Sequence, residues 1–228
     1  MDNKSENRYF LIIKKNKFLF TAYDSTKENI FTKEIFIGDH SINNIYYLLE
    51  NYLEKNILKI EKDLKSFVEN IYIIFESDSF FEVQSSIKHN LINNKIKDSL
   101  VDIRNQFHEY SPGYNIIHMI INKYIINGTT YNVLPEDFHN QNLVIEINFI
   151  CLEDKIISKL KKIFSKYQIS INKILSYEYL KKLNNYNGEN IVKVANENIN
   201  QLNVNEVFIV KKIRKNQGFF EKFFNFFN

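Results

Sequence analysis

The side chains able to do chemistry are few and scattered along this chain. His118 stands in an apolar run and is expected to be a hydrogen-bonded core residue. Cys151 is the only cysteine, which excludes an internal disulfide and a cysteine-rich zinc site, and its apolar surroundings predict a small buried hydrophobe. No two histidines have metal-ligand spacing, so no metal site is predicted among them: His40, His89, His108, His118 and His139.

Two acidic pairs resemble general acid–base pairs but occur where helices are expected to begin. Asp98 and Asp102 form one pair, and Glu153 and Asp154 form the other. Acidic residues are favoured at helix N-termini by the helix dipole, so we expect them to be solvated. A row of lysines is likewise expected to be a solvated helix face, with contact to lipid or a partner as the alternative: Lys155, Lys159, Lys162 and Lys166. We therefore expect no catalytic residue and no cofactor.

Composition places the chain among globular proteins. It has 228 residues, of which 44% are hydrophobic and 25% charged, and a net charge of +3. This length is ample for a buried core, and the charge is too small to indicate nucleic acid by itself. The polar start MDNKSENRYF is unlike a signal peptide, and no run of about 20 apolar residues occurs. A soluble protein of the reducing cytosol is expected.

The N-terminal third predicts strands followed by a long helix. Three apolar runs between 8 and 37 are separated by short polar stretches, which is typical of an antiparallel meander. From 38 to 64 the apolar spacing becomes helical, and Ser41 is a suitable N-cap. The run FVENIYIIF at 67–75 returns to β-character, and we expect the strand at 80–87 to pair with it.

The middle of the chain predicts a further α+β unit. A strand at 116–126 ends at the turn signal Asn127-Gly128. A strand at 143–150 alternates between a buried and a wet face, and an amphipathic helix with acidic start and basic end follows. A last strand is expected at 169–175. The polar stretch NNYNGEN is a boundary, beyond which a hairpin or an extended linker remain open alternatives.

The stretch from Tyr114 to Tyr177 contains an apolar strand with Ile117 and His118, a strand end at Tyr124, Ile125, Asn127 and Gly128, and a loop with Pro135. This order resembles part of FtsA, the actin-like bacterial cell-division protein. The similar part is its strand-helix-strand-strand insert, called SHS2 or subdomain 1C. The loop Glu136-Asp137-Phe138-His139-Asn140 departs from the family, where a Gly-rich segment is found. The positions that match the family pattern are Ile117, His118, Tyr124, Ile125, Asn127, Gly128 and Pro135.

The resemblance implies an α+β fold with four parts. They are a partial actin-like (ribonuclease H-like) region of subdomain 1A type at 1–66, an SHS2 domain at 67–183, a linker or hairpin at 184–217, and an amphipathic membrane-binding helix at 218–228. The N-terminal strands with the long helix and the C-terminal segment are similar to the family in pattern, whereas the identical residues lie mainly in the centre of the chain.

A phosphate-binding turn is missing from the expected place. Actin-fold ATPases carry an Asp-x-Gly-Thr-like turn between their first two strands, because Gly lets backbone amides approach phosphate. This chain has Ile12-Ile13-Lys14-Lys15-Asn16-Lys17 there, and its five glycines are not clustered. We expect no bound nucleotide and a shortened relative of FtsA without the ATP-binding half. A degenerate ATPase is the enzymatic alternative.

The C-terminus carries a phenylalanine-rich amphipathic pattern behind a basic cluster. Such a segment is typical of a helix lying in the plane of an anionic membrane. Partial burial of each Phe at roughly 1 kcal/mol predicts reversible binding. The alternative is that the tail folds back on the domain or packs on a partner. The expected membrane-binding residues are Lys211, Lys212, Arg214, Lys215, Phe219, Phe220, Lys222, Phe223, Phe224, Phe226 and Phe227.

Together these features favour a non-enzymatic cell-division adaptor. It would tether divisome proteins to the cytoplasmic face of the bacterial inner membrane at the division site, with the SHS2 domain making protein contacts and possible self-association. The alternatives are a pilus-assembly-type actin-like scaffold and a basic nucleic-acid-binding module, although no recognised nucleic-acid motif is present.

Overall fold

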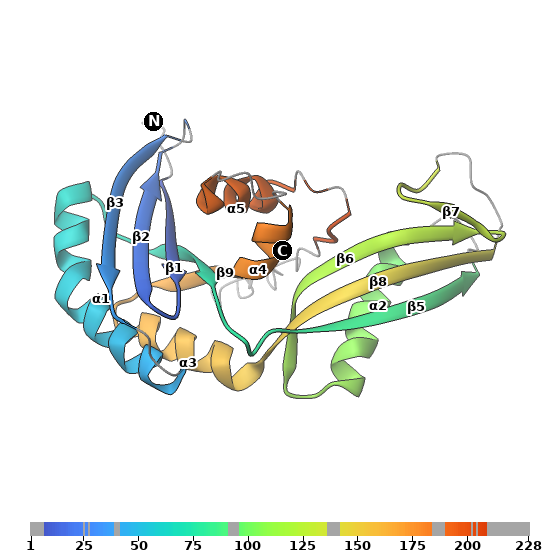
Figure 1. The fold of residues 1–228 in the computed structure, drawn as a ribbon, viewed down its shortest axis with the longest axis horizontal. Helices are drawn as coiled ribbons and strands as arrows, with labels where there is room; N and C mark the ends of the chain where they lie inside the picture. The colour runs from blue at the N-terminus through green and yellow to red at the C-terminus, as the bar shows by residue number, and fades with distance from the viewer. Residues whose placement is uncertain are drawn as a thin grey trace, which may run out of the picture.

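The computed structural model describes residues 7–24, 26, 28–38, 42–90, 96–135, 142–183, 190–201, 203 and 205–208. They form a mixed α+β fold in which two sheets lie end to end in an elongated molecule (Figure 1). The first sheet has the order β3-β2-β1-β4-β9 and the second has the order β5-β8-β6-β7.

The first sheet begins with the antiparallel meander predicted from the sequence. Its strands are β1 (Arg8–Ile13), β2 (Lys17–Tyr23), β3 (Asn29–Phe36), β4 (Asn70–Phe75) and β9 (Ser170–Ser176). Strands β4 and β9 are parallel to β1, so only β2 runs in the opposite direction. This order, with only β2 reversed, is that of a ribonuclease H-like sheet, which agrees with the partial actin-like fold class expected from the sequence.

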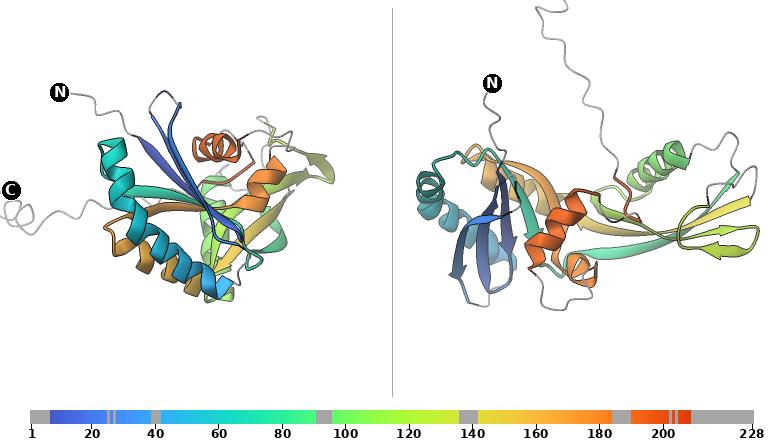
Figure 2. Two further views of the ribbon diagram at one scale, coloured as in Figure 1. Left: turned by 60° about the vertical axis from the view of Figure 1, so that its left-hand side comes forward. Right: turned by 90° about the horizontal axis from the view of Figure 1, so that it is seen from above.

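Helices cover both faces of the first sheet, so that its central strands are buried (Figures 1 and 2). On one face, α1 (Ile42–Leu64) and α3 (Asp154–Ser165) form a core with strand residues such as Leu11 and Phe20. On the other, α4 (Tyr177–Leu183) and α5 (Ile191–Ile199) pack on Phe10 and Ile74. Adjacent residues Phe10 and Leu11 enter different cores because side chains alternate along a strand.

The second sheet is antiparallel and has one helix on its buried face. Its strands are β5 (Phe81–Asn90), β6 (Tyr114–Ile126), β7 (Thr129–Tyr131) and β8 (Asn142–Glu153), and the helix is α2 (Ile96–Tyr110). The predicted alternation on β8 is confirmed, with Leu143 to Phe149 buried at every second position. The Asn127-Gly128 turn is also confirmed: both residues have positive φ, 50° and 86°, and they connect β6 to β7.

The expected pairing of the strand at 80–87 with the strand at 67–75 is wrong. Strand β5 pairs with β8 instead, from Phe81 opposite Cys151 to Asn90 opposite Asn142. Both edges of β4 are already occupied by β1 and β9, so it has no edge left for β5. Consequently the stretch 114–177 contributes to both sheets, with β6 and β8 in the second and β9 in the first.

The domain boundary expected after residue 66 does not coincide with the boundary between the sheets. Strand β4, helix α3 and strand β9 all belong to the first sheet and its core, although the sequence placed them within 67–183. The second sheet is therefore an insertion between β4 and α3, and its main elements run strand, helix, strand, strand as β5, α2, β6 and β8.

The expected linker or hairpin at 184–217 is wrong in its described part. Residues 191–199 form α5, capped by Asn190, whose side chain accepts a hydrogen bond from the Val192 amide at 3.0 Å. The β-branched Ile and Val suggested a strand, but burial of four apolar residues against the first sheet outweighs that weak propensity. The residues 136–141, 184–189 and 209–228 lie outside the described part of the chain, so the loop at 136–140 and the expected membrane-binding residues do too.

Candidate functional site

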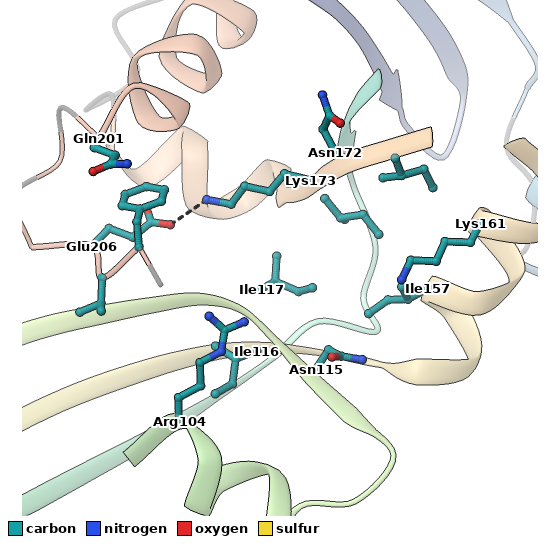
Figure 3. A pocket seen from close by; sticks show the side chains of 14 residues that line it. Arg104, Asn115, Ile116, Ile117, Ile157, Lys161, Asn172, Lys173, Gln201 and Glu206 are labelled. Atoms are coloured by element: carbon teal, nitrogen blue, oxygen red, sulfur yellow. Dashed lines mark hydrogen bonds and ion pairs between the residues drawn. The ribbon is translucent and has the colours of Figure 1, made fainter. Parts of the chain in front are cut away.

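A cleft of about 500 Å³ opens between the two sheets (Figure 3). Strand β6, helix α3 and strand β9 form its floor and sides, Arg104 of α2 reaches it, and the C-terminal segment, residues 203 and 205–208, closes one wall. Its apolar surface comes mainly from isoleucines: Ile116, Ile117, Ile157, Ile171 and Ile174. An apolar floor with a few convergent polar groups is typical of a binding site.

Strand β9 contributes a free sheet edge to this cleft. In the described part of the chain β9 pairs only with β4, and its residues 171–174 line the cleft. A register shift between Ile71 and Tyr72 leaves Asn172 without an opposite residue, and the Asn172 side chain is exposed. An open edge with unpaired backbone groups can accept an added strand from another polypeptide.

The charged groups of the cleft are mostly basic. Arg104, Lys161 and Lys173 line it together with a single carboxylate, Glu206. The Lys173 ammonium lies 3.4 Å from Glu206 Oε1 and 4.1 Å from the centroid of the Phe208 ring. Burial lowers the pKa of Lys173, and that of Arg104 as well.

Glu206 is the centre of a buried hydrogen-bond network behind the cleft. Its Oε1 is 2.8 Å from His118 Nδ1, and its Oε2 accepts from the Tyr179 hydroxyl at 2.8 Å and from the Asn198 side-chain amide. Burial opposes ionisation, but these donors and Lys173 outweigh it and lower the pKa of Glu206 to about 2. A buried carboxylate with this many donors stays charged at neutral pH.

The second ring nitrogen of His118 defines its protonation state. His118 Nε2 accepts from the backbone N–H of Ser176 at 3.0 Å, so the ring proton is on Nδ1 and is donated to Glu206. Complete burial lowers the pKa of His118, which keeps the ring neutral. His118 therefore connects β6, β9 and the C-terminal segment, and the prediction of a satisfied core histidine is confirmed.

The C-terminal segment is attached to β6 by backbone hydrogen bonds as well. The Ile121 amide donates to the Asn205 carbonyl, and the Val207 amide donates to the Met119 carbonyl, both at 2.8 Å. A β-bridge joins Ile120 to Glu206. These bonds fix the segment across the junction of the sheets, and Phe208 lines the cleft.

The turn between β1 and β2 is occupied by side-chain contacts. Lys14 Nζ donates to the Tyr177 hydroxyl at 2.6 Å and lies 4.0 Å from its ring centroid. Lys15 forms an ion pair with Asp78 at 2.7 Å, beside the end of β4. Among the described residues no group of three or more His, Cys, Asp or Glu is arranged to hold a metal ion.

The other residues that the sequence singled out as able to do chemistry lie in ordinary structural positions. Cys151 is buried and burial raises its pKa to about 12, which confirms a small hydrophobe. Asp102 is exposed on α2, while Glu153 is the N-cap residue of α3 and pairs with Lys155. His108 lies on α2 and His89 on β5, whereas His118 lies on β6, and His40 and His139 lie outside the described residues.

The lysine row on α3 and its C-cap is the solvent-exposed face that was predicted, since Lys155, Lys159, Lys162 and Lys166 are all exposed. Lys166 forms an ion pair with Glu50 of α1, and Lys159 Nζ lies 4.5 Å above the Tyr46 ring. Burial raises the pKa of Tyr46 to about 12. These two contacts connect α3 and its C-cap to α1 at the surface of the protein.

The sequence analysis missed Glu206, Tyr179 and Lys173 as members of one cluster. Their partners come from β6, β9, α4 and α5, which are brought together only by the tertiary fold. The one signal was a single carboxylate in the otherwise uncharged run NVNEVFIV. A lone carboxylate there requires buried donors once the flanking apolar residues are packed.

No helix among the described residues is long and apolar enough to cross a membrane. A scan against protein-family models and a search of curated proteins returned no match.

Comparison with solved structures found distant similarities. One is the cytoplasmic domain of EpsL, an inner membrane component of the type II secretion system of Vibrio cholerae, at 4% identity and a TM-score of 0.35, covering 75% of this chain and 57% of that one. Another is a PilM–PilN type IV pilus biogenesis complex, at 7% identity and a TM-score of 0.44, covering 77% and 49%. A Bacteroides thetaiotaomicron protein with an actin-like ATPase fold matches at 12% identity and a TM-score of 0.34, covering 80% and 58%. The chain thus spans about half the length of these structures.

Proposed function

We propose that this chain is a non-enzymatic adaptor that binds an extended segment of a partner protein in the cleft between its sheets. The observation that supports this most strongly is the free edge of β9 beside an apolar floor. Backbone hydrogen bonds to such an edge would supply affinity, and pockets for alternate side chains would supply selectivity. The basic groups Arg104 and Lys161 favour a segment that carries acidic residues, whereas Lys173 is already paired with Glu206.

The non-enzymatic character is part of this proposal. The β1–β2 turn, where an actin-like ATPase holds phosphate, carries lysines that are paired with Tyr177 and Asp78. The buried network around Glu206 has all its donors directed at one carboxylate and serves to position the C-terminal segment. These contacts favour a binding platform over a catalytic site.

Photo-crosslinking in the host cell tests the adaptor role. A photoreactive phenylalanine at Asn172, which is exposed in the cleft, should capture one discrete partner protein. The same residue at Thr130, exposed on β7 away from the cleft, is the matched control and should not capture it. Capture of the same proteins at both positions, or of none at Asn172, would overturn the proposal.

We further propose that the tail holds this adaptor at the cytoplasmic face of the bacterial inner membrane. The support is the sequence pattern of Phe residues behind Lys211, Lys212, Arg214 and Lys215. In a flotation assay the full chain should rise with liposomes containing acidic lipid, whereas a chain ending at Lys215 should stay in the bottom fraction of the gradient. Equal flotation of both chains counts against a membrane role for the tail.

The resemblance of 114–177 to FtsA supports the finer proposal that the partner is a cell-division protein. A pilus-assembly scaffold is the alternative with the same architecture. The position of the fluorescently tagged protein in its host separates the two, since a division adaptor accumulates at mid-cell. A distribution that ignores the division site contradicts the division role but leaves the cleft and the tail to their own tests.

A further inference from the structure

A second concave surface, here called the groove, lies where the C-terminal half of α1 meets the turn from α3 into β9. Its volume is about 640 Å³. Ile57 and Val68 are buried in its floor, and Leu58 and Phe67 stand on it with exposed fractions of 74% and 77%. Two large apolar side chains this exposed at one concave surface indicate a covered face in some state of the protein.

The rim of the groove is acidic. Glu54, Glu61 and Glu69 line it, and the only basic residue among the lining residues, Lys166, is already paired with Glu50. Glu61 Oε1 accepts from the Val68 amide at 2.9 Å, which holds the start of the strand β4 region against α1. An apolar groove with this rim favours a segment that is both apolar and basic.

We infer that the groove binds the C-terminal tail of the same chain, residues 211–228. The tail has the complementary chemistry, because phenylalanines recur at helical spacing from Phe219 onward and a basic cluster precedes them. Amphipathic helices commonly lie with their apolar face in such a groove. This inference rests on the amphipathic tail that the proposed function also uses.

The tail is long enough to reach the groove. The described chain ends at Phe208, whose ring centroid lies 4.1 Å from the Lys173 ammonium of β9, and Gln168, shortly before β9, lines the groove. Lys173 and Gln168 are five residues apart, which is about 17 Å of extended chain. The ten residues between Phe208 and Phe219 span up to about 33 Å when extended. Intramolecular binding therefore needs no rearrangement of the sheets.

Groove and membrane then compete for one set of phenylalanines. Tethering raises the effective concentration of the tail at its own groove, so the tail is withheld from lipid until the membrane offers a larger apolar and anionic surface. The groove acts as an intramolecular cover that limits membrane binding. It also shields the phenylalanines from aggregation.

Cysteine cross-linking in the full chain tests the contact. Leu58→Cys is combined with Phe223→Cys, and the matched control combines Phe36→Cys with Phe223→Cys, because Phe36 is 72% exposed on β3. Cys151 is buried and its pKa is raised to about 12, so it does not react. A short bis-maleimide should link Leu58→Cys to Phe223→Cys within one chain at least about fivefold faster than the control, and adding Glu54→Lys and Glu69→Lys should remove this advantage. Equal rates at both positions, or links only between two chains, overturn the inference.

Liposome flotation separates this inference from the membrane proposal. Full chains carrying Leu58→Ser and Phe67→Ser should float at lower lipid concentration than the unaltered chain, by about threefold or more, because the tail is released. The variant Phe36→Ser should float as the unaltered chain does. If the tail has no membrane role, none of these chains floats, yet the cross-link still forms. If the groove does not bind the tail, all three float equally and the cross-link fails.

Discussion

His118 Nδ1 and Glu206 Oε1 lie 2.8 Å apart in the core although 88 residues separate them in the chain. This bond joins the inserted sheet to the segment that leads into the tail, and the other ring nitrogen joins both to β9. The cleft is therefore bounded by a segment that is held by this carboxylate together with backbone hydrogen bonds to β6. Two of the predictions follow from this relationship.

Replacing Glu206 should destabilise the protein strongly. Glu206→Ala leaves His118, Tyr179 and Lys173 without their shared acceptor, and breaking a buried charged network costs about 3 to 5 kcal/mol of unfolding free energy. Urea denaturation of the variant and the unaltered protein measures this loss of unfolding free energy. The matched control is Glu178→Ala on α4, whose ion pair with Lys181 is exposed, and its cost should stay within about 0.5 kcal/mol. Similar losses in the two variants would show that Glu206 contributes no more than a surface carboxylate.

Stability should decrease as the pH falls from neutral. The folded pKa values of His118 and Glu206 are both lowered, and a lowered pKa gives stability that is present above the unfolded pKa and lost below it. The His118 contribution is thus lost as the pH falls below about 6.5, and the Glu206 contribution between about 4.5 and 2. The Glu206 contribution corresponds to roughly 3 kcal/mol of unfolding free energy.

Measuring the thermal unfolding midpoint across this pH range tests whether stability decreases as the pH falls. His118→Gln removes the titrating ring, so the decrease just below pH 6.5 should disappear while the lower one persists. A stability that rises on acidification from neutral pH would contradict the assignment of a neutral His118.

Helix α5 should depend on its cap. Asn190 accepts from the Val192 amide and donates to the Tyr23 hydroxyl at 2.9 Å, so Asn190→Ala should cost about 1 to 2 kcal/mol. Asn172→Ala, at an exposed position on β9, is the control and should be nearly neutral. Equal effects of the two changes would argue that the cap does not stabilise the described helix.

Local patterns in the sequence predicted much of the fold. The alternation on β8 and the stripe of Ile156, Leu160, Ile163 and Phe164 on α3 each reflect one face packing on a core, so their period is visible in the chain. The Asn127-Gly128 turn was visible for a similar reason, because positive φ favours these residues.

What the sequence did not predict depends on contacts between distant residues. Pairing of β5 with β8 is decided by which sheet edges remain free, and the burial of α5 is decided by a sheet face formed from other segments. The cluster around Glu206 draws donors from four elements, so no spacing in the sequence marks it. The site was therefore much less predictable than the elements that carry it.

The β1–β2 turn should not bind nucleotide. Lys14 is held by Tyr177 and Lys15 by Asp78, and the turn IIKKNK offers no glycine for close approach of phosphate. Isothermal calorimetry with ATP and Mg²⁺ should detect no binding heat. Saturable binding that is weakened by Lys14→Ala would revive an ATPase-like role for this turn.

The most direct test of the adaptor role is the affinity of the full chain for the partner protein captured by cross-linking at Asn172. Asn172→Trp places a bulky side chain in the cleft at an exposed position, whereas Thr130→Trp adds the same bulk on β7. If the partner binds in the cleft, Asn172→Trp should raise the dissociation constant at least about tenfold, which is about 1.4 kcal/mol of binding free energy. Thr130→Trp should leave the dissociation constant unchanged. The same dissociation constant for both variants would contradict a partner site in the cleft.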